Sequence, residues 1–326
     1  MKTLVLAILG VLTALGLALQ AQQGAPTPRT SWGEPDLQGT WTSQAELSVP
    51  LERPPEYGER RVLTDEEFAA RRAGVDRQLE ADGAEFDIET ADRSTVGQVG
   101  SATSPPPHWL ERGLASRRTS LVIDPADGRI PALTPEGERR AQTGSGTFVN
   151  GSFSNAAFNG PKDLSLWERC ITRGLPGAMF PTVYNANVAI VQSPGVVAIS
   201  YEMIHDTRVI PTDGGPPLAP AIRGYFGSSR GHWDGDTLVV DVDNFSDQAI
   251  YRGSRDTLHL TERFTRVGDA LHYEVTVEDP HTWTKPWTAA LELAPQPEGL
   301  FEYACHEGNN SMRNILSAAR AAERRR

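Results

Sequence analysis

The sequence predicts a mainly β protein, in which an antiparallel up-and-down meander of about eight strands forms a barrel or a strongly curved sheet. Residues 271–277 alternate strictly between apolar and polar side chains, as a half-buried strand does. Similar segments follow one another from residue 182 onward with short Gly-containing turns between them. Closing such a meander removes its exposed edges. An open two-layer sheet is the alternative.

The length and charge limit what the chain can be. Its 326 residues, 39% of them hydrophobic, suffice for a sizeable core. The net charge of -11 argues against a nucleic-acid partner, which needs a basic surface. We predict a signal peptide over residues 1–21, an irregular region with short helices over 22–181, and the meander with a C-terminal helix over 182–326. Residues 22–326 are expected to fold as one unit.

The first residues have the pattern of a secretory signal. Lys2 precedes an uncharged apolar run from Leu4 to Leu19, and polar sequence follows. A retained N-terminal anchor is the alternative. No second apolar segment reaches spanning length. We therefore expect a periplasmic or secreted protein without a membrane span after signal cleavage.

The irregular region contains two helix starts. Thr64 and Glu67 form a capping box that predicts a helix over residues 65–82. Thr134 before Pro135 predicts a second, short helix. We also expect strands over 37–43 and 119–124, a loop over 142–161 and a helix over 163–171.

The meander is divided by turn residues. Ser193-Pro194-Gly195, Asp234-Gly235 and Gly268-Asp269 predict tight turns. A cationic helix closes the chain over residues 310–324. The expected strands are 183–192, 196–210, 222–233, 237–245, 258–266, 271–277, 287–293 and 300–305.

The chain has two cysteines, Cys170 and Cys305. In an exported protein two thiols tend to form a disulfide, which we predict here. Two buried free thiols are one alternative. A nucleophilic Cys305 beside His306 is another, and it is incompatible with a disulfide.

Two family resemblances follow from short motifs. Gly39-Thr40-Trp41 resembles the opening Gly-x-Trp of the lipocalin-like calycin barrels, which bind small molecules. A second resemblance extends over nearly the whole mature chain. Four segments carry it: Asp124–Pro131, Glu168–Gly174, Glu202–Asp206 and Ala304–Asn309. Together they resemble a large uncharacterised family of exported bacterial proteins, which implies export but no particular reaction.

Residues 201–208 hold the densest group of reactive side chains. In a continuous strand, His205 would share the apolar face with Tyr201, and a neutral imidazole in a cavity can act as a general base. A hydrogen-bonded core histidine is the alternative. Glu202, Asp206 and Arg208 would occupy the other face, where they could orient an acid group or form solvated ion pairs.

His306 and Glu307 lie where the last expected strand meets the C-terminal helix. His306 could act as an acid beside His205, or the segment could simply connect two elements. A metal bound by both histidines with Asp206 or Glu307 is a further alternative, but no His-x-x-x-His spacing supports it, and we predict no metal.

Further substrate-binding candidates are spread along the chain. Arg173 could hold an anion in a bidentate manner or close a helix end. Trp283 and Trp287 could stack on a ligand or fill the core. Tyr184, Asn185 and Asn187 complete this set.

The sequence lacks the common catalytic and nucleotide-binding motifs, such as a Gly-x-Ser-x-Gly elbow or a P-loop. We therefore predict an exported enzyme without a cofactor that performs acid–base chemistry, as a lyase, isomerase, cyclase or hydrolase, on a small organic or sugar-like molecule in a barrel cavity. His205 would be the base and His306 the acid, with Tyr201 and Glu202 assisting and with Arg173 or Arg208 holding an anion. The alternatives are a non-catalytic periplasmic carrier of lipocalin type and a polysaccharide-binding module.

Overall fold

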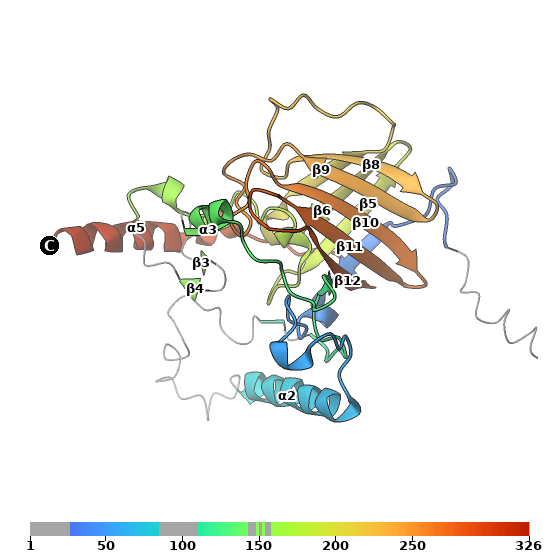
Figure 1. Cartoon of the computed structure of the whole chain (residues 1–326), viewed down its shortest axis with the longest axis horizontal. Coiled ribbons are helices and arrows are strands. Elements are labelled where there is room, and N and C mark those ends of the chain that lie inside the picture. Colours follow the sequence, from blue (N-terminus) through green and yellow to red (C-terminus); the bar gives the residue numbers. More distant parts are fainter. Residues whose placement is uncertain are drawn as a thin grey trace, which may run out of the picture.

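A computed structural model describes residues 27–84, 110–111, 113–142, 148–149, 152–153 and 158–325. Its centre is a ten-stranded antiparallel sheet in the order β7-β6-β5-β1-β12-β11-β10-β9-β8, with β2 paired to β12 (Figure 1). The strands are β1 (Gly39–Thr42), β2 (Val122–Asp124), β5 (Asn187–Ser193), β6 (Val196–Tyr201), β7 (Thr207–Pro211), β8 (Ser228–Asp234), β9 (Thr237–Asp243), β10 (His259–Val267), β11 (Ala270–Glu278) and β12 (Trp287–Pro295).

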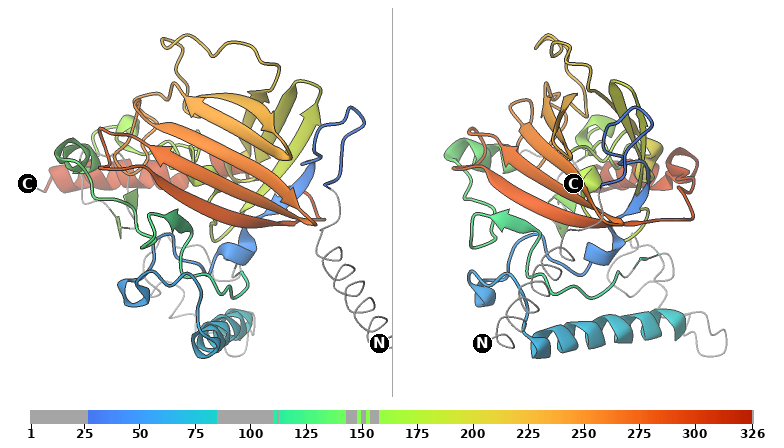
Figure 2. Two further views of the ribbon diagram at one scale, coloured as in Figure 1. Left: turned by 45° about the vertical axis from the view of Figure 1, so that its right-hand side comes forward. Right: turned by 90° about the vertical axis from the view of Figure 1, so that its right-hand side faces the viewer.

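The sheet curves until its two end strands meet, which confirms the predicted barrel-like fold. Strands β7 and β8 approach so closely that a Cβ atom on Gly231 would lie 2.9 Å from Cγ2 of Ile210. Glycine is the residue that permits this backbone approach. The strands wrap around a common interior in two views of the molecule (Figure 2).

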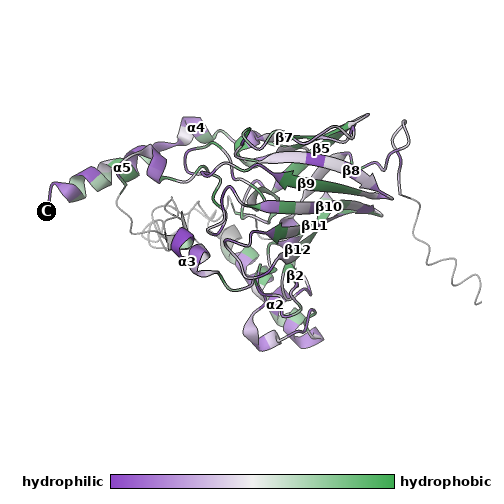
Figure 3. Ribbon diagram, turned by 45° about the horizontal axis from the view of Figure 1, so that its top comes forward, coloured by the Kyte–Doolittle hydropathy of each residue, from purple (hydrophilic) through white to green (hydrophobic). Residues whose placement is uncertain are grey.

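The core follows the alternation of the strands. On β11, Leu271, Tyr273, Val275 and Val277 are fully buried, as predicted. Their neighbours on β10 and β12, including Phe264 and Trp287, are also fully buried. Several strands carry hydrophobic colour in Figure 3, whereas α3 (Pro135–Gln142) is mainly hydrophilic. Large apolar side chains therefore fill much of the barrel interior.

The helices lie outside the barrel. Helix α2 (Asp65–Ala84) runs beneath it (Figure 2), and α5 (Asn310–Glu323) extends away from the barrel beyond the short helix α4 (Cys305–Gly308) (Figure 3). A two-stranded hairpin, β3 (Phe148–Val149) and β4 (Ser152–Phe153), lies apart from the barrel sheet. Within the described ranges, no helix is long and apolar enough to cross a bilayer. The predicted signal peptide falls outside those ranges.

The predicted helix caps are confirmed. The Thr64 backbone N–H donates to Glu67 Oε2 at 2.8 Å, and the Glu67 N–H donates to Thr64 Oγ1 at 3.3 Å. The Gly137 N–H donates to Thr134 Oγ1 at 2.9 Å at the start of α3. These contacts satisfy backbone donors that a helix start leaves free.

Several predicted elements and turn positions differ from the structure. Residues 196–210 form two strands, because Ile204 and His205 adopt left-handed φ values of 68° and 42° and turn the chain between β6 and β7. Residues 300–304 form an extended connection and α4 begins at Cys305, and residues 163–171 form successive turns after a 3-10 segment. The β8–β9 loop is Gly235-Asp236, one residue later than predicted, because Asp234 pairs with Thr237.

Polar cross-links attach the N-terminal region to the barrel. Arg118 donates to the Ala290 carbonyl on β12 at 2.6 Å and pairs with Glu46 at 3.1 Å. The buried Arg53 donates to Thr119 Oγ1 at 3.0 Å and to the Ala126 carbonyl at 2.7 Å. These contacts connect segments that lie far apart in the sequence.

Candidate functional site

Several predicted site residues gather at one end of the barrel. The strand registers place the starts of β5, β7, β10 and β12 at this end, together with the end of β6. Glu202 follows β6 directly, and Asn187 begins β5. We call this end of the barrel the site end.

An open polar pocket of about 530 Å³ lies beside the start of β5. The structure brings together four predicted site residues in it: Tyr184, Asn185, Asn187 and Glu202. The segment that returns from β12 supplies another part of its wall. The remaining lining residues are Gln44, Glu111, Gln296, Glu298 and Phe301.

Two amide side chains hold the Glu202 carboxylate. Asn185 Nδ2 donates to Glu202 Oε1 at 2.6 Å, and Asn187 Nδ2 donates to Oε2 at 2.5 Å. The Glu202 N–H also donates to the Asn187 carbonyl at 3.0 Å. Glu202 is only 2% exposed. Hydrogen bonds of this kind compensate for burial of a carboxylate and fix its orientation.

Glu111 is a second carboxylate in this pocket, and the sequence analysis did not identify it. The backbone N–H groups of Asn185 and Ala186 favour the ionised form of its carboxylate. Its Oε2 atom is buried, and no hydrogen-bond partner for it lies within the described part of the chain. Burial raises the pKa of Glu111, and the charge of Glu202 raises it further. The two carboxylates are therefore electrostatically coupled.

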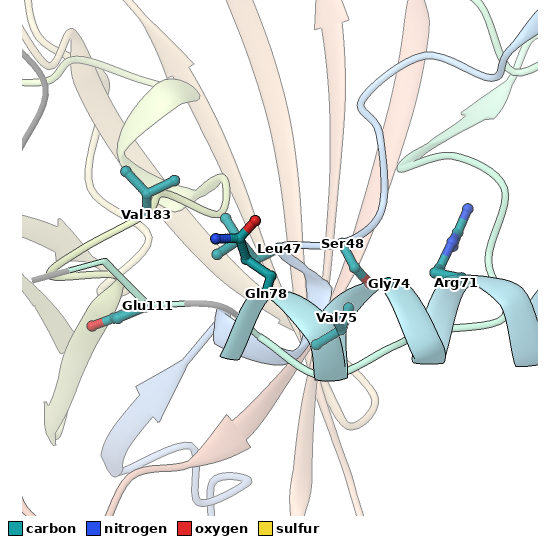
Figure 4. Close-up of a pocket in the computed structure, with 8 residues that line it drawn as sticks. All are labelled: Leu47, Ser48, Arg71, Gly74, Val75, Gln78, Glu111 and Val183. Atoms are coloured by element: carbon teal, nitrogen blue, oxygen red, sulfur yellow. The ribbon is translucent and has the colours of Figure 1, made fainter. Parts of the chain in front are cut away.

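Glu111 also lines a second pocket, of about 400 Å³, beside α2. In Figure 4 the side chains of Arg71, Val75 and Gln78 on α2 lie on one side of this space, with Val183 and Glu111 beyond them. Glu111 thus belongs to the lining of both pockets. No periodic pattern in residues 83–118 predicted this position.

Arg173 lies close to three tyrosines near the pocket. Its Nη1 donates to the Phe180 carbonyl at 3.2 Å, and its charge acts on Tyr184, Tyr251 and Tyr303. Burial lowers the pKa of Arg173 to about 10. The rings of Tyr184 and Tyr303 are stacked, with centroids 6.2 Å apart.

The two histidines are exposed, so the expectation that His205 faces the barrel interior is wrong. His205 Nδ1 lies 3.2 Å from the Tyr303 carbonyl, because the turn after β6 directs it toward the segment before α4. His306 and Glu307 are exposed on α4. Among the described residues, no hydrogen bond joins the two imidazoles, and no group of three His, Cys, Asp or Glu side chains could hold a metal.

Tyr201 and Arg208 lie inside the barrel, so the expectation that Arg208 belongs to a polar outer face is wrong. Arg208 forms a buried ion pair with Glu262 on β10, and Tyr273 Oη donates to Glu262 at 2.8 Å. Burial raises the pKa of Tyr201. This cluster crosses the interior from β7 to β10 and β11.

Trp283 and Trp287 belong to the core at the site end. They are 2% and 0% exposed, and their rings meet edge to face at 5.9 Å. Tyr251 stacks on Trp287 with a centroid distance of 6.4 Å. Trp287 therefore packs between Tyr251 and Trp283, and both tryptophans are shielded from solvent.

A disulfide between Cys170 and Cys305 confirms the predicted pairing and ties two site segments together. It links the loop that carries Arg173 to the start of α4. Asn309 Nδ2 adds hydrogen bonds to the Glu168 carbonyl at 2.8 Å and to Cys170 Sγ at 3.3 Å. The oxidised sulfurs cannot act as nucleophiles.

Comparison of the sequence with protein-family models and with curated proteins finds no match.

Proposed function

We propose that the chain is an enzyme that performs acid–base chemistry on a small, polar, sugar-like molecule in the pocket lined by Glu111 and Glu202. The observation that supports this most is the pairing of two unlike carboxylates. Glu111 has a buried free oxygen and a raised pKa, whereas two amides hold Glu202. A carboxyl group with a raised pKa is suited to act as an acid, and an oriented carboxylate in the same pocket can act as a base.

The proton transfers follow from these environments. Protonated Glu111 gives its proton to an oxygen atom of the substrate as the bond to that oxygen breaks. Glu202 accepts a proton from a carbon atom or from an attacking water. Solvent then restores both groups. The pocket suits a hydroxyl-bearing substrate, because Asn and Gln amides line it beside the aromatic rings of Tyr184 and Phe301. The exposed His205 and His306 are not required for this chemistry.

Export is part of the proposal. The Cys170–Cys305 disulfide supports an oxidising compartment such as the periplasm or the cell exterior. N-terminal sequencing of the protein from the periplasmic fraction of a bacterial host should give a mature chain that starts near residue 22. A protein found intact in the cytoplasm, with reduced thiols, would contradict export.

The enzymatic part is tested by substrate screening. We would incubate the purified chain with aryl glycosides and measure the phenol that hydrolysis releases. We would also incubate it with uronate oligosaccharides and measure the ultraviolet absorbance of the unsaturated product that elimination forms. For any turnover found, Glu111→Gln and Glu202→Gln should each lower kcat by about 100-fold or more, the usual contribution of a general acid or base. Glu66→Gln, at an exposed position on α2, is the matched control.

A carrier is distinguished by the same experiment. Tight stoichiometric binding of a co-purified molecule without any product would contradict the enzyme. Full activity in Glu111→Gln and Glu202→Gln together with complete loss in His205→Ala would restore the histidine mechanism instead.

A further inference from the structure

The loop that carries Arg173 places a cation among aromatic hydroxyl groups. Arg173, Tyr184, Tyr251 and Tyr303 are each partly exposed, so their cluster opens to solvent. Tyr184 stacks on Tyr303 and also lines the polar pocket. Tyr251 rests on the fully buried Trp287. The cluster thus has a rigid base and adjoins the pocket through Tyr184.

A second cation flanks this cluster. The charge of the Arg252 side chain acts on Tyr251, and the Arg252 backbone lies in the left-handed region with φ 50°. The charges of Arg173 and Arg252 therefore both act on Tyr251. In the described part of the chain, no carboxylate forms an ion pair with either arginine. Glu52 is the acidic side chain whose charge reaches Tyr251, and it accepts the Ile130 N–H at 3.0 Å.

A partly buried guanidinium without a counter-ion is an unfavourable arrangement. Its energy improves when an anion occupies the site, and the planar fork of arginine matches a carboxylate. Phenol hydroxyl groups beside it can donate further hydrogen bonds to such an anion. Among the described residues, Arg173 donates one hydrogen bond, from Nη1 to the Phe180 carbonyl, which leaves other N–H groups of the fork for a ligand.

We infer that Arg173, assisted by Arg252 and by the hydroxyls of Tyr184, Tyr251 and Tyr303, forms a subsite for the carboxylate group of an organic substrate. The inference depends on the proposed function only in that this substrate is the molecule on which Glu111 and Glu202 act. Tyr184 would lie between the carboxylate and the reacting part of the molecule. The substrate class is thus an acidic, hydroxyl-bearing molecule such as a sugar acid.

The test measures binding and needs no turnover. Calorimetry with the full mature chain would compare glucuronate with glucose, and benzoate with benzyl alcohol. At least one acid should bind about tenfold more tightly than its neutral partner, and this preference should weaken with added salt. Arg173→Gln should abolish the preference, and Arg173→Lys should keep part of it. Tyr184→Phe, which retains the ring, should reduce it. Arg169→Gln, on the same loop, is the matched control and should leave it unchanged.

Three results would overturn the inference. The first is equal binding of each acid and its neutral partner. The second is an equal effect of the Arg169 and Arg173 variants. The third is inorganic sulfate binding as tightly as the organic acids, which would indicate a site for free anions. Near-ultraviolet circular dichroism of each variant verifies that the aromatic packing is intact.

The same titration in Glu111→Gln separates this inference from the proposed function. If the subsite exists, this variant should retain the preference for the acid. Retained preference without any turnover by the wild type would contradict the enzyme and leave the anion subsite standing.

Discussion

The barrel core and its site end are stabilised in different ways. The core is built from neighbouring strands whose alternate side chains are fully buried, as on β11. The site end is built from segments distant in sequence and joined by polar contacts, such as the Cys170–Cys305 disulfide and the amides on Glu202. Local periodicity therefore determines the core, whereas the site depends on a few specific long-range cross-links.

The largest expected effect is in the core. Trp287→Ala removes a fully buried ring that contacts Trp283 and Tyr251. We expect a loss of about 3–5 kcal/mol in the free energy of unfolding, measured by urea denaturation. The conservative variant Trp287→Phe should lose less. A loss below about 1 kcal/mol, close to the effect of substitutions at surface sites, would mean that the interior is loosely packed.

The buried ion pair tests the same interior electrostatically. Glu262→Gln leaves Arg208 buried without its counter-ion, and we expect a loss of about 3–5 kcal/mol. The double variant Arg208→Met with Glu262→Met should recover most of this loss, since a well-packed apolar pair avoids the desolvation cost. If Arg208→Met with Glu262→Met were less stable than Glu262→Gln, the attraction within the ion pair would stabilise the fold by more than the desolvation of the two charges costs.

Removing the disulfide should act on the site end. Cys170→Ser with Cys305→Ser releases a cross-link between residues 135 positions apart, and we expect a loss of about 2–5 kcal/mol. Hydrogen exchange should increase mainly around residues 165–180 and 303–310, while the amides of β10–β12 stay protected. Uniform loss of protection across all strands would show that the two regions are not separable.

The smallest expected effect is on the pH dependence of folding stability. Because the pKa of Glu111 is raised by burial and by Glu202, the folded chain holds its proton more tightly than the unfolded chain. Stability should therefore fall as pH rises from the ordinary value near 4.5 through the raised value, and it should level off above it. Glu111→Gln should remove this part of the slope. An unchanged slope in that variant would contradict the raised pKa.

The sequence predicted those parts of the fold that depend on local pattern. The alternation of Leu271 to Val277 and the capping pair Thr64 and Glu67 are confirmed. The prediction of a continuous strand failed at residues 203–206. The left-handed turn at Ile204 and His205 contains no Gly or Pro, the residues by which a turn is recognised in a sequence. Tyr184, Asn185, Asn187 and Glu202 were selected by residue type, and the fold brings them into one pocket.

Glu111 could not be found from the sequence. It lies in a segment without periodicity, and the groups that influence its carboxylate, at Asn185, Ala186 and Glu202, are distant in the sequence. Alternation with Glu202 and Asp206 placed Arg208 on a polar strand face. Its partner Glu262 is 54 residues away in the sequence, so no local pattern indicated the buried pair. Contacts of this range depend on how strands are arranged around the barrel, which local patterns do not encode.

The coupling of the two carboxylates is the central claim, and carbon-13 NMR titration of glutamate-labelled protein tests it most directly. The Glu111 carboxyl resonance, assigned by its loss in Glu111→Gln, should titrate above the ordinary value near 4.5, and Glu202→Gln should move that midpoint downward. A Glu111 that titrates at its ordinary value and does not respond to Glu202→Gln would contradict the proposed acid–base site.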